Sequence, residues 1–255
     1  MKNIWAIAKK EMKAYFTSPI AYVVITVFLV LVGFFFYSLI WWFNSQSIQM
    51  AQNQYYYQQI NINQMVYSPL FHNMSIILLL MLPLLTMRLF SEEKKVGTDE
   101  LLYTSPISVS QIILGKYLAS LIVLAAMLCL TGILSIFTFA FGNPEPAPLL
   151  NGYLGLFLMG AAFLGVGIFF SSVTENQIIS AILTFGALLL FWILNWASYS
   201  AGGIWKDILN YLSFFQHFDD MTQGILDTTD VVYYVSFIFF GLFLTHSVIQ
   251  SRRWR

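Results

Sequence analysis

Residues 19–43 read PIAYVVITVFLVLVGFFFYSLIWWF, a stretch of the chain without a single charged side chain. A helix needs about 20 largely apolar residues to cross the roughly 30 Å hydrocarbon core of a membrane. Five further stretches meet this requirement with no charge in their middle: 71–89, 117–141, 152–170, 178–197 and 231–249. The sequence therefore predicts an all-α integral membrane protein with six transmembrane helices, forming a single transmembrane domain over residues 1–255.

The composition supports this fold class and excludes others. Hydrophobic residues make up 58% of the chain and charged residues only 9%, whereas a soluble domain carries roughly 25% charge. The single cysteine, Cys129, excludes an intrachain disulfide framework and a multi-cysteine metal site. The formal net charge is zero, so charge gives no reason to expect a nucleic-acid partner. We predict no metal and no cofactor.

No catalytic motif stands out in the sequence. Gly115-Lys116 resembles the end of an ATP-binding loop, but Ser110 and Tyr117 occupy positions where that motif needs Gly and Ser or Thr. We therefore expect no enzyme activity in this chain, and we expect any ATP hydrolysis to take place on a separate partner. The three histidines are scattered, and we expect each to be satisfied by hydrogen bonds rather than by a metal.

The positive charges are distributed unevenly between the predicted loops. With six spans, only Lys206 among the 12 Lys and Arg residues falls on one side, and the others share the opposite side. Cytoplasmic loops carry the excess of Lys and Arg in membrane proteins. The sequence thus predicts that both termini are cytoplasmic.

Residues 1–17 are predicted to form an amphipathic helix. Its apolar residues fall on one arc of about 120° and its lysines on an adjacent arc of about 100°; these are Ile4, Trp5, Ala8, Met12, Tyr15 and Phe16, and Lys2, Lys9, Lys10 and Lys13. Such a helix lies in the membrane interface with its lysines toward anionic headgroups. It would be either a generic anchor or an elbow helix that also contacts a cytoplasmic partner.

The second cytoplasmic segment, 88–116, carries the strongest local signals. Gly97 permits a sharp turn, Thr98 can cap a short helix, and that helix must end before Pro106. Ser108 and Gln111 form a capping box for the next helix. The short helix presents Leu101, Leu102 and Tyr103, which would either bind a partner or rest on the membrane.

Three other segments give weaker predictions. Thr174–Gln177 is predicted to be a capping box in a tight turn, and the small residues of 160–167 indicate close helix packing, within the chain or between two copies. Residues 199–230 are predicted to form an interfacial or re-entrant helical hairpin on the outer face. The polar loop 44–69 carries no assignment.

Two signatures together resemble those of ABC-2-type transporter permeases, especially the branch associated with gliding motility. The first contains Glu92, Glu93, Gly97, Thr98, Asp99, Glu100, Leu101, Leu102, Pro106, Gly115 and Lys116. The second contains Gln216-His217-Phe218, Gly224, Asp227 and Tyr233-Tyr234, and is followed by Arg252-Arg253-Trp254. The resemblance covers nearly the whole chain.

This resemblance implies a pair of permease chains, identical or different, working on two ATP-binding cassette subunits in a bacterial inner membrane. Residues 98–104 would be the coupling helix, with Glu92, Glu93, Glu100 and Lys116 among the coupling residues. The N-terminal helix, with Trp5, Lys9, Lys10 and Lys13, would be the elbow helix beside the ATPase.

The preferred interpretation is an ATP-driven exporter of a lipid-linked, polysaccharide or otherwise amphipathic substrate. The first alternative is a mechanotransmission or scaffold subunit of an envelope or gliding machine, through which no substrate passes. A passive channel or scramblase is the third interpretation.

Overall fold

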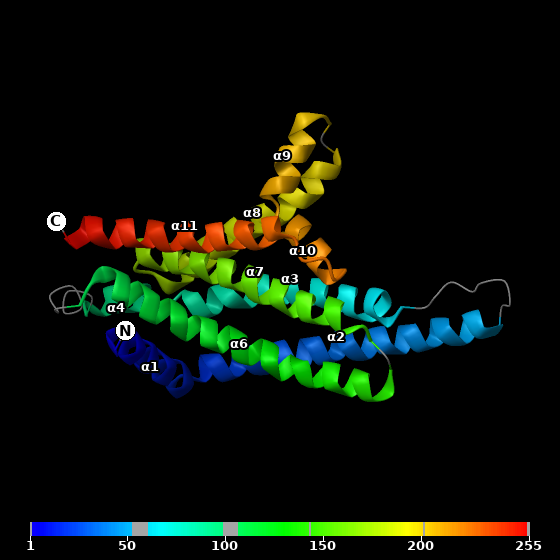
Figure 1. Ribbon diagram of the computed structural model, residues 1–255. Helices are drawn as coiled ribbons and strands as arrows, with labels where there is room; N and C mark the ends of the chain where they lie inside the picture. The colour runs from blue at the N-terminus through cyan, green and yellow to red at the C-terminus, as the bar shows by residue number, and fades with distance from the viewer. Residues whose placement is uncertain (1, 53–60, 99–106, 143, 201, 254–255) are drawn as a thin grey trace.

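The computed structural model describes residues 2–52, 61–98, 107–142, 144–200 and 202–253, and these ranges are almost entirely helical (Figure 1). In chain order the helices are α1 (Lys2–Thr17), α2 (Pro19–Gln52), η1 (Asn63–Tyr67), α3 (Ser68–Thr86), α4 (Ser91–Val96), α6 (Val109–Phe141), α7 (Pro146–Val173), α8 (Gln177–Ser200), α9 (Ile204–Leu212), α10 (Phe214–Thr222) and α11 (Thr228–Arg253). Within the described ranges, six spans are long and apolar enough to cross a membrane; they contain α2, α3, α6, α7, α8 and α11. The predicted all-α membrane fold is confirmed.

Helices α3 and α7 form the centre of the bundle. Two thirds of the most apolar window is buried in each of these helices, against 17% in α2 and in α8. Helix α7 packs closely because it is rich in glycine: a Cβ on Gly160 would lie 2.8 Å from a methyl carbon of Leu124 on α6, and Gly165 meets Gly241 of α11. Small residues let membrane helices approach in this way. The small residues of α7 therefore serve packing within the chain.

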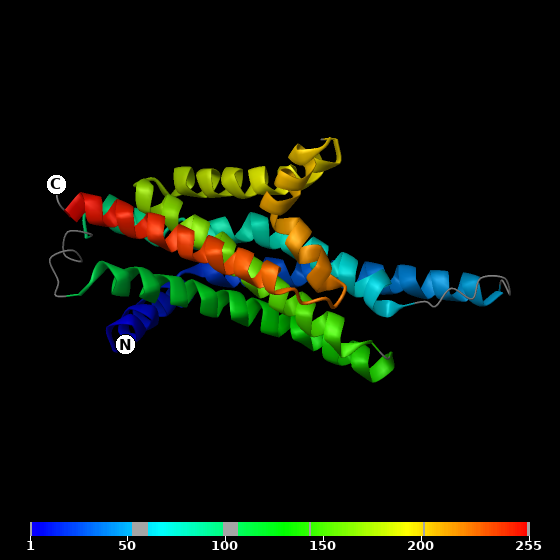
Figure 2. The same cartoon turned by 45° about the horizontal axis from the view of Figure 1, so that its top comes forward.

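Both termini lie at the same end of the bundle, which we call the terminal end (Figures 1 and 2). Helices α1 and α4 lie there too, and α6 begins there. The opposite end holds the C-terminal part of α2, the start of α3 and the start of α7. Helices α9 and α10 lie between the end of α8 and the start of α11, away from the termini.

Several helix limits differ from the sequence-based prediction. Helix α2 continues past Phe43 to Gln52 and η1 forms over Asn63–Tyr67, so the predicted loop 44–69 is partly helical. The continuation is understandable because residues 44–52 contain neither Gly nor Pro. Helix α3 ends at Thr86, three residues after Pro83, whose missing N–H weakens the helix from within.

The turn between α7 and α8 is capped differently from the prediction. The side chain of Asn176 accepts hydrogen bonds from the N–H groups of Ile178 (2.9 Å) and Ile179 (3.4 Å), so Asn176 is the N-cap of α8. Thr174 instead accepts one bond from the Asn176 N–H (3.1 Å). The predicted capping box starting at Thr174 is wrong because α8 begins later, and asparagine is as good an N-cap as threonine.

Residues 199–230 contain the expected short helices, but α9 packs along the end of α8 and meets α10 at a corner at Ser213 instead of folding back on it (Figure 1); we call the α9–α10 pair the hairpin. The side chains of α9 are largely exposed, and the helix stands out from the bundle in both views (Figures 1 and 2). Helix α10 is short as well, but it buries Phe214, Phe215 and Phe218 against the bundle. The hairpin therefore has one docked helix and one largely exposed helix that packs mainly along the end of α8.

Candidate functional site

A buried lysine joins three helices at the terminal end. The Lys116 side chain on α6 is only 2% exposed, and its Nζ lies 2.9 Å from Oε1 of Glu11 on α1 and 2.8 Å from Oε1 of Glu93 on α4. Its third bond goes to the backbone carbonyl oxygen of Leu89, at 2.6 Å. An ammonium group has three donors, and all three are used here. We call Glu11, Glu93, Lys116 and the Leu89 carbonyl the Lys116 joint.

The charges of the Lys116 joint are balanced. Lys116 faces two carboxylates, and Nζ of Lys10 lies 3.8 Å from Oε1 of Glu93, which brings a second positive charge. The ammonium of Lys116 also lies 5.0 Å above the Phe90 ring, where the ring electrons attract a cation. A buried charge is costly unless it is paired and hydrogen-bonded, and this arrangement meets both conditions.

Gly115 allows α1 to reach the Lys116 joint. A Cβ at this position would lie 2.7 Å from Cβ of Ile7 and 3.0 Å from the carbonyl oxygen of Ile4, so only glycine fits under α1. Asn3 adds a hydrogen bond to the side chain of Gln111 at 3.3 Å. Gly115 and Lys116 therefore act together, because the glycine brings α1 close and the lysine binds it.

Tyr15 fixes the other end of α1. Its buried hydroxyl donates a hydrogen bond of 2.9 Å to the carbonyl oxygen of Leu85 on α3, and its ring lies 5.9 Å from the guanidinium carbon of Arg88. Burial raises the pKa of Tyr15, so the hydroxyl stays a donor. Arg88 also pairs with Glu92 at 3.2 Å, four residues later. Helix α1 is thus bound to α3 as well as to α6.

The turn before α4 is fastened to α7 by one serine. Oγ of Ser171 accepts hydrogen bonds from the N–H groups of Phe90 (3.0 Å) and Ser91 (3.3 Å) and donates to the carbonyl oxygen of Met87 (3.1 Å). Nζ of Lys94 donates to the carbonyl oxygen of Ser172. Helix α4 therefore links α7 to the Lys116 joint.

Helix α4 ends in a left-handed glycine. Gly97 has φ 74°, and its N–H bonds the carbonyl oxygen of Lys94 at 3.1 Å, while the N–H of Thr98 bonds that of Glu93 at 3.0 Å. Glycine favours such a helix end because it has no Cβ. The predicted sharp turn at Gly97 is present. It ends α4 shortly after Glu93, the residue that binds Lys116.

Part of the second signature comes together where α10 meets α11, through His217, Tyr233 and Tyr234. Nδ1 of His217 lies 2.7 Å from Oδ1 of Asp230, and the imidazole stacks on the Tyr233 ring with centroids 4.0 Å apart. The hydroxyl of Tyr234 donates to the carbonyl oxygen of Phe214 at 2.6 Å. Within the described residues, no three His, Cys, Asp or Glu side chains are placed to hold a metal ion.

Comparison with known families decides the class of this protein. A family described as ABC-2 family transporter protein matches residues 5–249, nearly the full chain. The chain belongs to the ABC-2 transporter family. A comparison with curated proteins finds no significant match. The protein is therefore a multi-pass permease subunit of an ABC transporter, a family whose members work with an ATP-binding partner.

The permease brings together part of the residue set predicted from its sequence. Glu93 and Lys116 meet in the joint, with Lys10 beside them, and Gly97 and Thr98 end α4. Glu92 binds Arg88 instead, and Trp5, Lys9 and Lys13 are exposed on α1, away from the joint. The remaining predicted residues fall outside the described ranges; they are Asp99, Glu100, Leu101, Leu102 and Pro106.

Sequence reasoning missed Glu11 of the permease. It is the only acidic residue on α1, surrounded in sequence by Lys9, Lys10 and Lys13. A single acid on a basic helix signals a specific positive partner, and that partner is Lys116. The residues of the predicted apolar arc do not share one environment. Ala8 and Tyr15 are buried against the protein, whereas Trp5 is exposed. The reason is that Gly115 lets α1 pack on α6 instead of resting on lipid alone.

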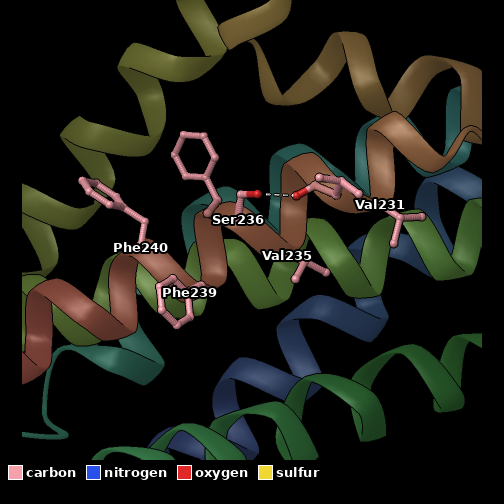
Figure 3. A pocket seen from close by; sticks show the side chains of 7 residues that line it. Val231, Val235, Ser236, Phe239 and Phe240 are labelled. Atoms are coloured by element: carbon pink, nitrogen blue, oxygen red, sulfur yellow. Dashed lines mark hydrogen bonds between the residues drawn. The ribbon is translucent and has the colours of Figure 1, made fainter.

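A groove of about 710 Å³ runs along the permease's last span. Figure 3 shows the side chains of α11 that line it, with Phe239 and Phe240 turned to different sides of the helix. Among the described lining residues, Ser236 alone carries a hydroxyl, and it donates to the carbonyl oxygen of Val232 on the same helix. The described residues that line the groove include no charged side chain, so this surface suits hydrocarbon chains. It is lined by Val231, Val232, Val235, Ser236, Phe237, Phe239 and Phe240.

Proposed function

We propose that this permease is the membrane subunit of an ATP-driven exporter and that the Lys116 joint transmits the motion of a separate ATP-binding subunit to the spans. The observation that carries the proposal is the set of three bonds on one buried ammonium. They tie α1, α4 and α6 to a single point. Helix α4 leads directly into residues 98–104, which the sequence predicts to be the coupling helix.

A displacement of α4 would be passed on through Glu93. Removing one partner from a buried ion pair leaves an uncompensated charge and costs about 3–5 kcal/mol. The three helices are therefore expected to move together rather than to separate. Because α4 is also held on α7 through Ser171, the same motion reaches the centre of the bundle.

The proposed orientation places the terminal end in the cytoplasm of a bacterium, with the chain in the inner membrane. The support is the clustering of positive residues on α1, α4 and the start of α6, which matches the bias of cytoplasmic segments. Lys9 and Lys13 are exposed there. An ATP-binding subunit would dock on this end, and two permease chains would pair on two such subunits.

The proposed substrate is lipid-linked, polysaccharide or otherwise amphipathic. The groove along α11 supports the lipid-linked and amphipathic classes because its described lining residues are apolar apart from the Ser236 hydroxyl. A charged substrate would need paired polar groups at such a surface.

The first experiment is a pull-down of the tagged permease from native membranes in mild detergent, read by mass spectrometry. We expect an ATP-binding cassette subunit in near-equal amounts. Its absence, under conditions that preserve other ABC complexes, would contradict ATP-driven export and favour a passive channel or scramblase.

A paired substitution tests the coupling role. Leu101→Asp with Leu102→Asp should reduce the ATP-binding subunit recovered with the permease and lower the ATP hydrolysis of the complex, while membrane insertion stays normal. Ile225→Asp with Leu226→Asp is the matched control, because these two exposed apolar residues lie beyond the hairpin. Equal recovery and equal hydrolysis in both variants would argue against a coupling helix at 98–104.

The exposed apolar face of α9 favours a second function, that of a mechanotransmission subunit in an envelope or gliding machine. Ile204, Trp205 and Tyr211 are each more than half exposed on this helix. A photo-crosslinker at Trp205 in intact cells distinguishes the two. Capture of a periplasmic or outer-membrane protein would support the machine, whereas capture of lipid alone would count against it.

A further inference from the structure

Two histidines fasten the α9–α10 hairpin, and each lies between two hydrogen-bond acceptors. His217 has Oδ1 of Asp230 at 2.7 Å from Nδ1 and the carbonyl oxygen of Tyr211 at 3.0 Å from Nε2. His72 has Oδ1 of Asp219 at 2.5 Å from Nε2 and the carbonyl oxygen of Ser68 at 2.8 Å from Nδ1. A backbone carbonyl can only accept, and an imidazole ring has two N–H donors only when it is protonated.

The two rings connect four helices. His217 on α10 binds the last turn of α9 through Tyr211 and the first turn of α11 through Asp230. His72 on α3 binds Asp219 of α10. With both rings protonated, the hairpin is therefore bonded to two spans by charge-assisted hydrogen bonds, which are roughly twice as strong as neutral ones.

The surroundings of the rings are acidic. Asp230 and Asp219 bind the two rings directly, and Asp220 and Asp227 lie near enough to interact with His217. Burial, together with the charges of Asp230 and Asp219, raises the pKa of Asp220. The other titratable groups against His217 are phenols, Tyr211 and Tyr233, whose rings contact the imidazole. When the two rings are protonated, they supply positive charge to this acidic cluster.

Asp230 depends most strongly on its histidine. The residue is 4% exposed, and its Oδ2 makes no hydrogen bond. It lies in the first turn of α11, where the helix dipole favours a negative charge, but its only side-chain ion partner among the described residues is His217. Loss of the His217 proton would leave Asp230 buried without a balancing cation.

We propose that the α9–α10 hairpin is closed by a proton-dependent latch, fastened to α3 and α11 when His72 and His217 are protonated and loosened when they lose their protons. The latch is independent of the ATP-binding partner and of the Lys116 joint. It would make the position of the hairpin respond to the pH on its own side of the membrane.

Amide hydrogen exchange of the full chain in lipid nanodiscs tests the latch. We expect protection of the amides of residues 211–222 to fall about tenfold between about pH 5.5 and about pH 8, the range in which histidine changes charge, after correction for the intrinsic pH dependence of exchange. Protection in α7 should stay constant. Unchanged protection of the hairpin in the unmodified chain would overturn the proposal without any variant.

Variants identify the groups that titrate. His72→Gln with His217→Gln should give a hairpin whose protection no longer changes with pH. His246→Gln is the matched control, because His246 is the remaining histidine and lies near the other end of α11. A pH response that survives in the double variant, or one that is lost in His246→Gln, would overturn the latch.

Discussion

Gly115 and Ile7 are in such close contact that a methyl group on the glycine would lie 2.7 Å from the isoleucine Cβ. This approach brings α1 onto α6 one residue before Lys116, and the joint forms there. The Gly115-Lys116 pair resembles an incomplete nucleotide-binding pattern in sequence, but in the structure it holds α1 and α4 on α6 at the terminal end.

Gly115→Ala should therefore displace α1. Forcing an extra methyl group into a packed site costs about 1–3 kcal/mol, so we expect a lower midpoint of thermal unfolding in detergent, measured by tryptophan fluorescence. Gly132→Ala is the control on the same helix, because a Cβ there meets nothing within 4 Å. Equal midpoints for the two variants would contradict the close packing of α1.

Lys116→Met should destabilise the terminal end more strongly. The substitution leaves Glu11 and Glu93 facing each other without their cation, and breaking a buried pair in this way costs about 3–5 kcal/mol. Lys95→Met, which removes an exposed lysine from α4, should have little effect. Thermal unfolding of the two variants in the same detergent checks the difference.

Removing the carboxylate charges should rescue the Lys116 variant. In the triple variant Glu11→Gln, Glu93→Gln, Lys116→Met, no uncompensated charge remains, so stability should recover at least in part, as expected for coupled residues. Export should stay impaired, because the neutral cluster no longer ties α1 and α4 to α6. A triple variant as unstable as Lys116→Met would contradict the ionic origin of the joint.

Ser171→Ala should loosen α4. The change leaves the N–H groups of Phe90 and Ser91 without their acceptor, and each unsatisfied buried group costs about 1–3 kcal/mol. We expect faster amide exchange in α4. Ser172→Ala is the neighbouring control, since the Ser172 hydroxyl donates to the carbonyl oxygen of Phe169 in its own helix and to no other group of the described residues. Exchange in α4 that is identical in both variants would disprove the role of Ser171.

Asp220 and Asp227 should respond to neutralisation in opposite directions. Burial and nearby carboxylates raise the pKa of Asp220 above 3.8, so its charge opposes folding once the pH exceeds that value. Asp220→Asn should then raise the unfolding temperature at neutral pH and have no effect in acid. The backbone N–H of Thr229 lowers the pKa of Asp227, so its charge favours folding until the pH falls through its lowered pKa.

Asp227→Asn should accordingly lower the unfolding temperature at neutral pH, with the difference from the unmodified chain vanishing in acid. The unfolding temperatures of both variants, followed over the acid range, check the two signs. Shifts in the same direction would contradict the assignment.

The spans could be predicted because membrane insertion depends on local composition. A run such as 19–43 is apolar enough by itself, whatever it packs against. Helix ends were less predictable: α2 continues to Gln52 because nothing in the polar stretch after Phe43 breaks a helix. The N-cap of α8 is Asn176 and not the predicted Thr174. Both residue types cap helices well, so the sequence alone does not decide between them.

The sites themselves depend on contacts between distant residues. The first sequence signature contains Lys116. Its partner Glu11, however, lies 105 positions away, and no local pattern links the two. The helical spacing of residues 199–230 predicted short helices there. It did not predict the pairing of His72 with Asp219, which lie 147 positions apart. Amphipathic spacing could not reveal that α1 packs on the protein, because the close approach depends on Gly115.

The position of α1 also sets an order on biosynthesis. This helix is translated before the groups that hold it, because the Leu85 carbonyl and Lys116 belong to the second and third spans. Until the second and third spans have left the ribosome, the buried face of α1 lacks the groups that bind it. The exposed lysines and Trp5 of α1 suit a helix that lies on the membrane surface during that time. Helix α1 is therefore expected to reach its final place only after the third span has been made, and it then closes the terminal end of the bundle.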